Sequence, residues 1–139
     1  MLGKYQHNVD AKGRLFVPAK FRAELGESFV AAAVMDHCIC LYSLAEWNER
    51  MAKLSDQPMT KEVRKLSRYL ASHACDVDID AQGRINLKKE LLEYASIEKE
   101  ALVIGAGTRA EIWNPTMYEQ EMDEIDDNEI ETALAVALF

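Results

Sequence analysis

Two short stretches of the chain carry the same loop, and each loop bears an arginine. Residues Asp10 to Arg14 and Asp80 to Arg84 share the pattern Asp-Ala-x-Gly-Arg, seventy residues apart. The aspartate side chain accepts hydrogen bonds from backbone N–H groups two or more residues on, and glycine adopts the positive φ that reverses a chain. We therefore expect four loop-shaping residues, which are Asp10, Gly13, Asp80 and Gly83.

The remaining positions of these loops carry side chains that recognise nucleic acids. Arginine and glutamine hydrogen-bond to guanine and adenine edges in the major groove, and lysine contacts phosphates. Arg14 and Arg84 end the two loops, with Lys12 at the first tip and Gln82 at the second. A plain hairpin turn is the alternative, because a turn needs only the aspartate and the glycine. Two copies that both retain arginine favour a pair of DNA-contacting hairpins.

Catalysis has weaker support in the sequence. Asp76, Asp78 and Asp80 alternate along one predicted strand, and paired carboxylates can perform acid–base chemistry. No serine, cysteine or histidine constellation accompanies them, and aspartates before a turn commonly face solvent. We expect neither an enzyme nor a small-molecule substrate.

The cysteines do not indicate a metal centre. Cys38, Cys40 and Cys75 are an odd number, which indicates reduced thiols in a chain without an export signal. His37 and His73 lie near them in the sequence, but the matched Cys-x2-4-Cys pairs of zinc sites are absent. We expect no metal and no other cofactor.

The charge of the chain is sharply divided. The net charge is −8, yet nine acidic residues and no lysine or arginine lie between Glu111 and Phe139, so residues 1–110 carry +1. Residues 1–22 hold five basic residues against one acidic residue. Local charge therefore permits DNA binding where total charge opposes it. Beyond the loops, the basic candidates for DNA contacts are Lys4, Lys20 and Arg22.

No apolar run approaches the roughly 18 residues that span a bilayer, and the first residues lack the apolar core of a secretory signal. We expect a cytoplasmic protein with no membrane partner.

The repeat extends beyond the loops and predicts the elements that hold them. At an offset of seventy residues, apolar positions coincide on both sides of each loop, with period-two alternation typical of half-buried strands. A short helix follows each loop, over 18–26 and 88–95, and two further strands follow each helix. A basic amphipathic helix over 60–71 joins the halves; its basic face is either solvated or a supporting contact to DNA phosphates. Each half is too small to fold comfortably alone.

Two such units can share a core by interleaving their strands. Closure of the sheet would also remove exposed strand edges. We therefore predict an α+β chain in which two β-β-α-β-β repeats form a pseudo-symmetric β-barrel with peripheral helices.

These motifs resemble the MraZ family, cytoplasmic bacterial proteins with two SpoVT-AbrB-type domains. The resemblance covers nearly the whole chain and rests on the runs YQHNVDAKGRLFVPAKFR, CLYSLAEW, DAQGRI and EIWNP, in that order. It implies a swapped-hairpin barrel with both halves on one chain, and ring-shaped homo-oligomers. It also implies a nucleoid-associated transcription regulator, usually a repressor. Such a regulator binds short direct repeats ahead of the division and cell-wall gene cluster, including its own promoter.

Carried over by position, the DNA-contacting loops of the family fall on Lys12, Arg14 and Arg84. With this resemblance, residues 1–55 form a first SpoVT-AbrB-type repeat, 56–72 a connecting helix and 73–118 a second repeat. Residues 119–139 form an acidic C-terminal helix or tail, which we expect to lie away from the DNA. An antitoxin-like module, with a DNA-binding barrel and an acidic tail that wraps a toxin, is the alternative function.

Overall fold

A computed structural model describes all 139 residues, and both halves follow the predicted order of strands and helices. The first half comprises β1 (Lys4–Asn8), β2 (Arg14–Phe16), α1 (Ala19–Leu25), β3 (Ser28–Met35), β4 (Cys38–Ser43) and α2 (Leu44–Ser55). After α3 (Lys61–Ser72), the second half comprises β5 (Ala74–Asp78), β6 (Arg84–Asn86), α4 (Lys89–Tyr94), β7 (Glu100–Gly105), β8 (Ala110–Trp113) and α5 (Pro115–Asp123). Helix α6 (Asp127–Val136) ends the chain. The predicted α+β class is confirmed.

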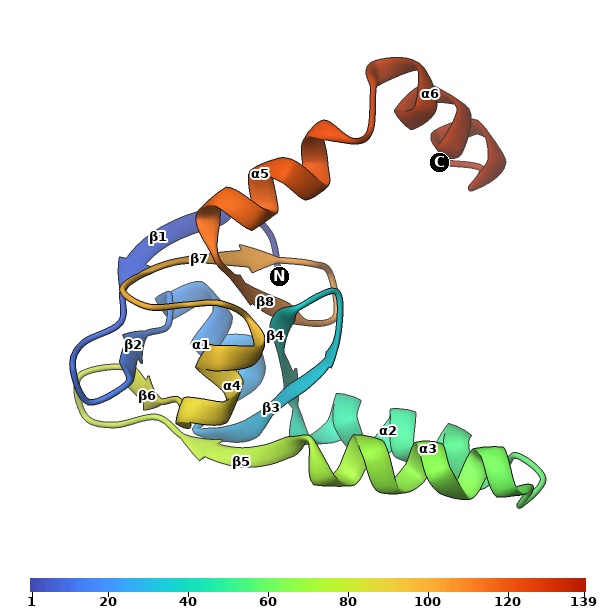
Figure 1. The fold of residues 1–139 in the computed structure, drawn as a ribbon, viewed down its shortest axis with the longest axis horizontal. Coiled ribbons are helices and arrows are strands. Elements are labelled where there is room, and N and C mark those ends of the chain that lie inside the picture. Colours follow the sequence, from blue (N-terminus) through green and yellow to red (C-terminus); the bar gives the residue numbers. More distant parts are fainter.

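The two halves exchange strands within an antiparallel sheet of six strands (Figure 1). The strand order is β1-β7-β8-β4-β3-β5, so β1 of the first half pairs with β7 of the second, and β5 of the second pairs with β3 of the first. Strands β2 and β6 pair with each other in a separate two-stranded ribbon. Pairing ends at β1 and β5, so the hydrogen-bond ladder does not close into the predicted barrel. Neither half has a sheet of its own.

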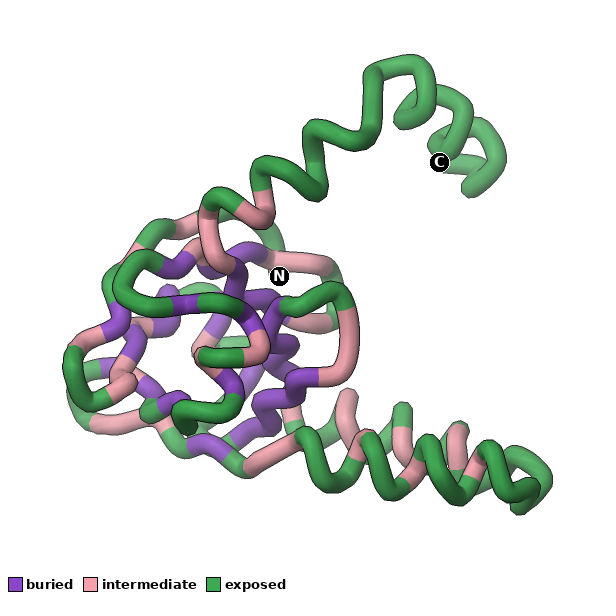
Figure 2. Tube along the Cα trace, viewed as in Figure 1, coloured by how far each residue is buried: buried purple, intermediate pink, exposed green.

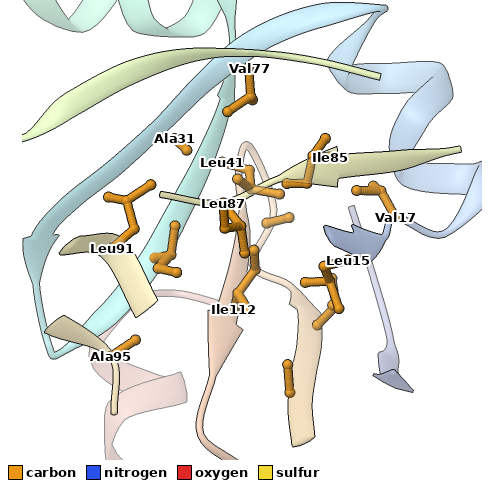
Figure 3. Close-up of a cluster of buried hydrophobic side chains, with 14 of the residues drawn as sticks. Leu15, Val17, Ala31, Leu41, Val77, Ile85, Leu87, Leu91, Ala95 and Ile112 are labelled. Atoms are coloured by element: carbon orange, nitrogen blue, oxygen red, sulfur yellow. The ribbon is translucent and has the colours of Figure 1, made fainter. Parts of the chain in front are cut away.

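The ribbon strands supply the centre of the shared core. Leu15 and Ile85 lie opposite each other across β2 and β6 and are 0% and 1% exposed. Val17 and Leu87 continue the same alternation, and Figure 3 shows all four side chains in one cluster with Ile112 of β8. Burial of such a side chain contributes roughly 1.5–3 kcal/mol. The period-two pattern therefore fixes which face of the ribbon turns inward and, with it, where the two loops end.

Helices α1 and α4 begin in the same way although their preceding residues differ. Pro18 and Lys88 are both extended N-cap residues, with ψ of 139° and 149°. Each caps by its carbonyl, which accepts the N–H of Phe21 or Leu91. Proline thus precedes α1 rather than occupying its first turn, and lysine serves equally well at the equivalent position.

Two peripheral segments extend from the body. Helices α2 and α3 form one arm, and α5 and α6 form another (Figure 1). None of these four helices contains a buried residue, and Figure 2 shows both arms as exposed or half-buried along their length. None of the helices combines the length and apolar character that crossing a bilayer requires.

Candidate nucleic-acid interface

The first loop is organised by its own aspartate. Asp10 Oδ1 accepts the backbone N–H groups of Lys12 and Arg14, both at 2.9 Å, and Oδ2 accepts Arg14 Nε–H at 2.6 Å. The N–H of Gly13 donates to the Asp10 carbonyl at 3.0 Å, and the φ of Gly13 is 81°. A single carboxylate therefore fixes both the backbone of the turn and the direction of the arginine.

The second loop has the same set of hydrogen bonds. Asp80 Oδ1 accepts the N–H groups of Gln82 and Arg84, both at 2.9 Å, and Oδ2 accepts Arg84 Nε–H at 3.1 Å. Gly83 has a φ of 79°. The repeated sequence thus builds the same turn twice.

Backbone donors lower the pKa of both aspartates. The largest cause at Asp10 is the N–H of Arg14, and the largest cause at Asp80 is the N–H of Arg84. Hydrogen bonds to a carboxylate favour its charged form. Both aspartates are therefore negative near neutral pH, where they can partner the arginines.

The two loops are also joined to each other. Val17 N–H donates to the Gly83 carbonyl at 3.0 Å, and Leu87 N–H donates to the Gly13 carbonyl at 2.8 Å. Arg84 Nη1 lies 3.9 Å from Asp10 Oδ2, which adds an ion pair between the loops. Loops that are seventy residues apart in sequence therefore form one joined unit, with one loop at each end of the short antiparallel β2–β6 ribbon.

The arginines are partly exposed at this unit. The side chains of Arg14 and Arg84 are 33% and 29% exposed. Each pairs with its aspartate through Nε, on the inner side of the guanidinium. The terminal nitrogens of Arg14 make no hydrogen bond within the chain, whereas Arg84 Nη2 donates to Gln82 Oε1 at 3.3 Å. A guanidinium held by Nε keeps its terminal N–H groups for an outside acceptor such as a base edge.

The other basic candidates lie at different distances from the loops. Lys12 is exposed on the first loop, and Lys20 is exposed on α1. Arg22 lies against the second loop, where its guanidinium carbon is 5.3 Å from the centre of the Phe16 ring and its buried Nε has no hydrogen-bond partner. Lys4 is at the far end of β1, 5.9 Å from the centre of the Tyr118 ring of α5. The structure therefore brings Arg22 to the loops and does not bring Lys4 there.

Comparison with known proteins also finds a twofold repeat in this chain. The family model "MraZ protein, putative antitoxin-like" matches residues 1–68 and again residues 70–138. The chain belongs to the MraZ family. A relative from Thermoanaerobacter sp. (strain X514), named "Transcriptional regulator MraZ", is 44% identical over 91% of this chain and 89% of its own.

Two further relatives carry the same name. The Acetivibrio thermocellus protein is 46% identical over 84% of this chain and 82% of its own. The Halothermothrix orenii protein is 40% identical over 97% and 95%. The double match of the MraZ model corresponds to the two halves that exchange strands in the fold.

The acidic arm of this MraZ chain points away from the loops. In Figure 1 the β1–β2 and β5–β6 loops lie at one side of the body, and α6 lies beyond the other side. The eight acidic side chains from Glu119 to Glu131 are all exposed. Within one chain, negative charge is therefore kept apart from the arginines.

One cluster of metal-ligand types occurs outside the loops. The candidate ligand atoms of Cys38, Cys40 and Glu111 lie within 4.8 Å of one another. Glu111 is already engaged, because Arg109 pairs with one oxygen at 2.9 Å and Trp113 Nε1–H donates to the other at 3.0 Å. The Cys38 and Cys40 sulfurs lie 3.9 Å apart and either thiol can donate; their interaction raises the pKa of Cys38 and lowers the pKa of Cys40. The cluster is a partly buried ion pair beside two buried thiols.

The histidines near these cysteines in the sequence belong to other contacts. The ring of His37 stacks on Tyr94 at 5.1 Å between centroids, and that of His73 stacks on Tyr69 at 4.1 Å.

Sequence reasoning missed the residues that connect the loops. Val17 and Leu87 act through their backbone N–H groups, and Phe16 forms the surface on which Arg22 rests. Phe16 ends β2 between the core residues Leu15 and Val17, so this alternation was the available signal that it faces outward. No sequence signal identified the partner of each backbone N–H group.

Proposed function

We propose that this protein is a sequence-specific DNA-binding transcription regulator. The observation that carries the proposal is the joined pair of loops, each with an arginine whose Nε is held by an aspartate. Further support comes from relatives named as transcriptional regulators. By family resemblance, its target is short direct repeats in its own promoter, ahead of the division and cell-wall gene cluster, where it acts as a repressor. No catalytic role is proposed, and the protein is nucleoid-associated.

The β2–β6 ribbon presents the loops to the major groove, which admits a two-stranded ribbon. The terminal N–H groups of Arg14 and Arg84 contact base edges. Gln82 contacts a base edge or positions Arg84, since its Oε1 already accepts from that guanidinium. Lys12, Lys20 and Arg22 contact phosphates, and Lys4 makes at most a peripheral contact because it lies beside α5. The four loop-shaping residues, Asp10, Gly13, Asp80 and Gly83, hold this arrangement.

Several copies act together in a homo-oligomeric ring. One chain offers a handful of basic contacts, which is weak at physiological salt. Linked copies on adjacent repeats raise the apparent affinity by a factor on the order of 10² or more. In this proposal residues 1–55 and 73–118 are the two SpoVT-AbrB-type repeats of a swapped-hairpin fold, 56–72 connects them, and 119–139 is an acidic tail.

Salt-dependent binding to promoter DNA tests this function. We expect wild-type protein to prefer DNA with the direct repeats over random DNA of equal length, with log affinity falling steeply with log salt. Arg14→Ala and Arg84→Ala should each lose about 1–3 kcal/mol per contacted base, the typical worth of a bidentate contact. Lys53→Ala removes one positive charge from exposed α2 and should bind as wild type. Equal binding of promoter and random DNA by all four proteins would refute sequence-specific recognition.

An antitoxin-like function is the second candidate. The exposed acidic arm of α5 and α6 favours it, because such a tail can wrap a basic partner. Recovery of a stoichiometric toxin with the purified full-length protein would support this candidate.

A further inference from the structure

Two unpartnered surfaces remain that DNA recognition does not use. The first is the arm formed by α2 and α3. Leu66 and Tyr69 of α3 are 45% and 40% exposed, and Met59 ahead of the helix is 57% exposed. Leu66 and Tyr69 lie three residues apart on one face of α3, and Met59 lies just before the extended N-cap residue Thr60. Leu66 and Tyr69 remain partly exposed, although the ring of His73 stacks on Tyr69 at 4.1 Å between centroids.

The second surface is the C-terminal arm. Ile130 and Leu134 of α6 lie four residues apart on one helix face and are 41% and 43% exposed. Leu138 follows the end of α6, where its φ of 57° is no longer helical, and it is 93% exposed. A helix of ten residues is marginal in isolation and gains most of its stability from packing its apolar face. Helix α6 therefore requires a surface that its own chain does not provide.

The two surfaces carry opposite charges. Helix α3 has four basic side chains and one acidic side chain, and the basic ones are Lys61, Arg64, Lys65 and Arg68. Residues 115–139 have eight acidic side chains and no basic ones. Apolar stripes bordered by opposite charges are the pattern that lets two helices pack with ion pairs at the edges of the contact.

We propose that α6 of one copy of this chain packs on α3 of a second copy. Ile130 and Leu134 lie against Leu66 and Tyr69, and the acidic side chains of α6 face the basic side chains of α3. The contact is between chains because the two arms diverge from the body and α6 does not lie along α3 (Figure 1).

The base of the C-terminal arm is also fixed. The Tyr118 ring packs edge-on against Trp113 at 5.5 Å between centroids, and Asn114 caps α5.

Since every chain has one donor arm and one acceptor arm, the contact is heterologous and propagates from copy to copy. This inference rests on the homo-oligomer of the proposed function and specifies one of its contacts. It does not depend on how the loops read DNA.

Charge reversal on each surface tests the contact. The first variant, Lys65→Glu with Arg68→Glu, makes α3 acidic; the second, Glu129→Lys with Glu131→Lys, makes the flanks of α6 basic. Particle mass is measured by native mass spectrometry and sedimentation on full-length protein. We expect each variant alone to weaken self-association at least tenfold, because two ion pairs become repulsions. Lys89→Glu, an equally exposed reversal on α4, should leave the mass unchanged.

Mixing the two variants decides between contacts within and between chains. In a 1:1 mixture, each α6 meets an α3 of opposite charge only on the other variant, so large particles of alternating chains should return. All the substituted side chains are exposed, so the body of each variant should keep the wild-type fold, and α6 should lose helical circular dichroism where the contact is lost.

Three results would overturn the proposal. Unchanged masses in both single variants would leave the arms without a role in assembly. A mixture that stays dissociated would show that α6 of one chain does not pack on α3 of another. Loss of DNA affinity by the α3 variant at unchanged mass would assign the basic face to DNA phosphates. Failure of the DNA proposal is separately visible, because Arg14→Ala should retain the wild-type mass whatever it does to DNA binding.

Discussion

The two loops have the same backbone conformation and differ in the contacts that their arginines make. In the first loop, Arg14 is tied to Asp10 at 2.6 Å and its terminal nitrogens make no hydrogen bond within the chain. In the second, Arg84 is held more loosely by Asp80, at 3.1 Å, and its terminal nitrogens lie beside Gln82 and Asp10. The same turn therefore presents two guanidinium groups whose terminal nitrogens have different contacts.

The glycines of the two loops also meet different neighbours. A methyl group on Gly13 would lie 2.7 Å from the backbone carbonyl oxygen of Leu87. A methyl group on Gly83 would instead lie 2.8 Å from a terminal nitrogen of Arg22. The Leu87 carbonyl can move only if the β2–β6 ribbon moves, whereas the Arg22 side chain can rotate away. Duplication therefore preserved the hydrogen bonds that form the turn, and the flanking side chains diverged.

The largest expected effect is on stability, at the core positions of β2 and β6 where the two halves have matching roles. Leu15→Ala and Ile85→Ala each remove a fully buried side chain from opposite positions of β2 and β6, so each should cost roughly 2–5 kcal/mol of unfolding free energy. The double variant should cost less than the two single changes together, because the residues are neighbours. Urea denaturation at one fixed protein concentration measures all three values. A near-neutral result for either residue would mean that its strand is not part of the shared core.

The second prediction separates the two glycines. Alanine at a positive φ costs roughly 1–2 kcal/mol, and we expect Gly83→Ala to stay near that range. Gly13→Ala should cost more, because its methyl group also displaces the Leu87 carbonyl that continues the ribbon. Urea denaturation of both variants gives the comparison.

Removing Arg22 provides the control for the glycine comparison. In an Arg22→Ala background, Gly83→Ala should cost less than before, and Gly13→Ala should cost the same. Equal costs for both glycines in both backgrounds would contradict the difference in their surroundings.

The sequence predicted the elements of this fold better than their partners. Alternation around Leu15 and Ile85 identified the ribbon strands and their buried face, and the repeat located both loops. The sequence did not predict which strands pair. Alternation indicates which face of a strand is buried, but it does not indicate that β1 pairs with β7. The same limit hid the ion pair between Arg84 and Asp10, which depends on the two halves lying side by side.

The helices show the same difference between features that local sequence predicts and features that it does not. The basic helix over 60–71 was predicted and is α3, since its apolar spacing is local information. The acidic stretch after Glu119 was predicted as one helix or tail and is instead the end of α5 followed by α6, with Asp126 as a new N-cap.

The smallest effect is expected from acid, and it distinguishes the turn from the ion pair. The pKa values of Asp10 and Asp80 are lowered from 3.8 in the folded protein. A lowered carboxyl pKa contributes stability above the unfolded value, and this contribution is lost as pH falls through the folded value. Both loops should therefore keep their turns at pH 4 and above and loosen below that pH.

The cause of the lowered pKa values makes this prediction specific. Since the largest cause at each aspartate is a backbone N–H, Arg14→Ala should leave the pKa of Asp10 below 3.8, and Arg84→Ala should do the same for Asp80. Carboxyl carbon shifts in an NMR titration measure both values in each variant. A return to 3.8 would mean that the guanidinium, not the turn, holds the carboxylate. The aspartate and arginine would then act as one unit, and loss of DNA binding by an arginine variant would no longer report a base contact alone.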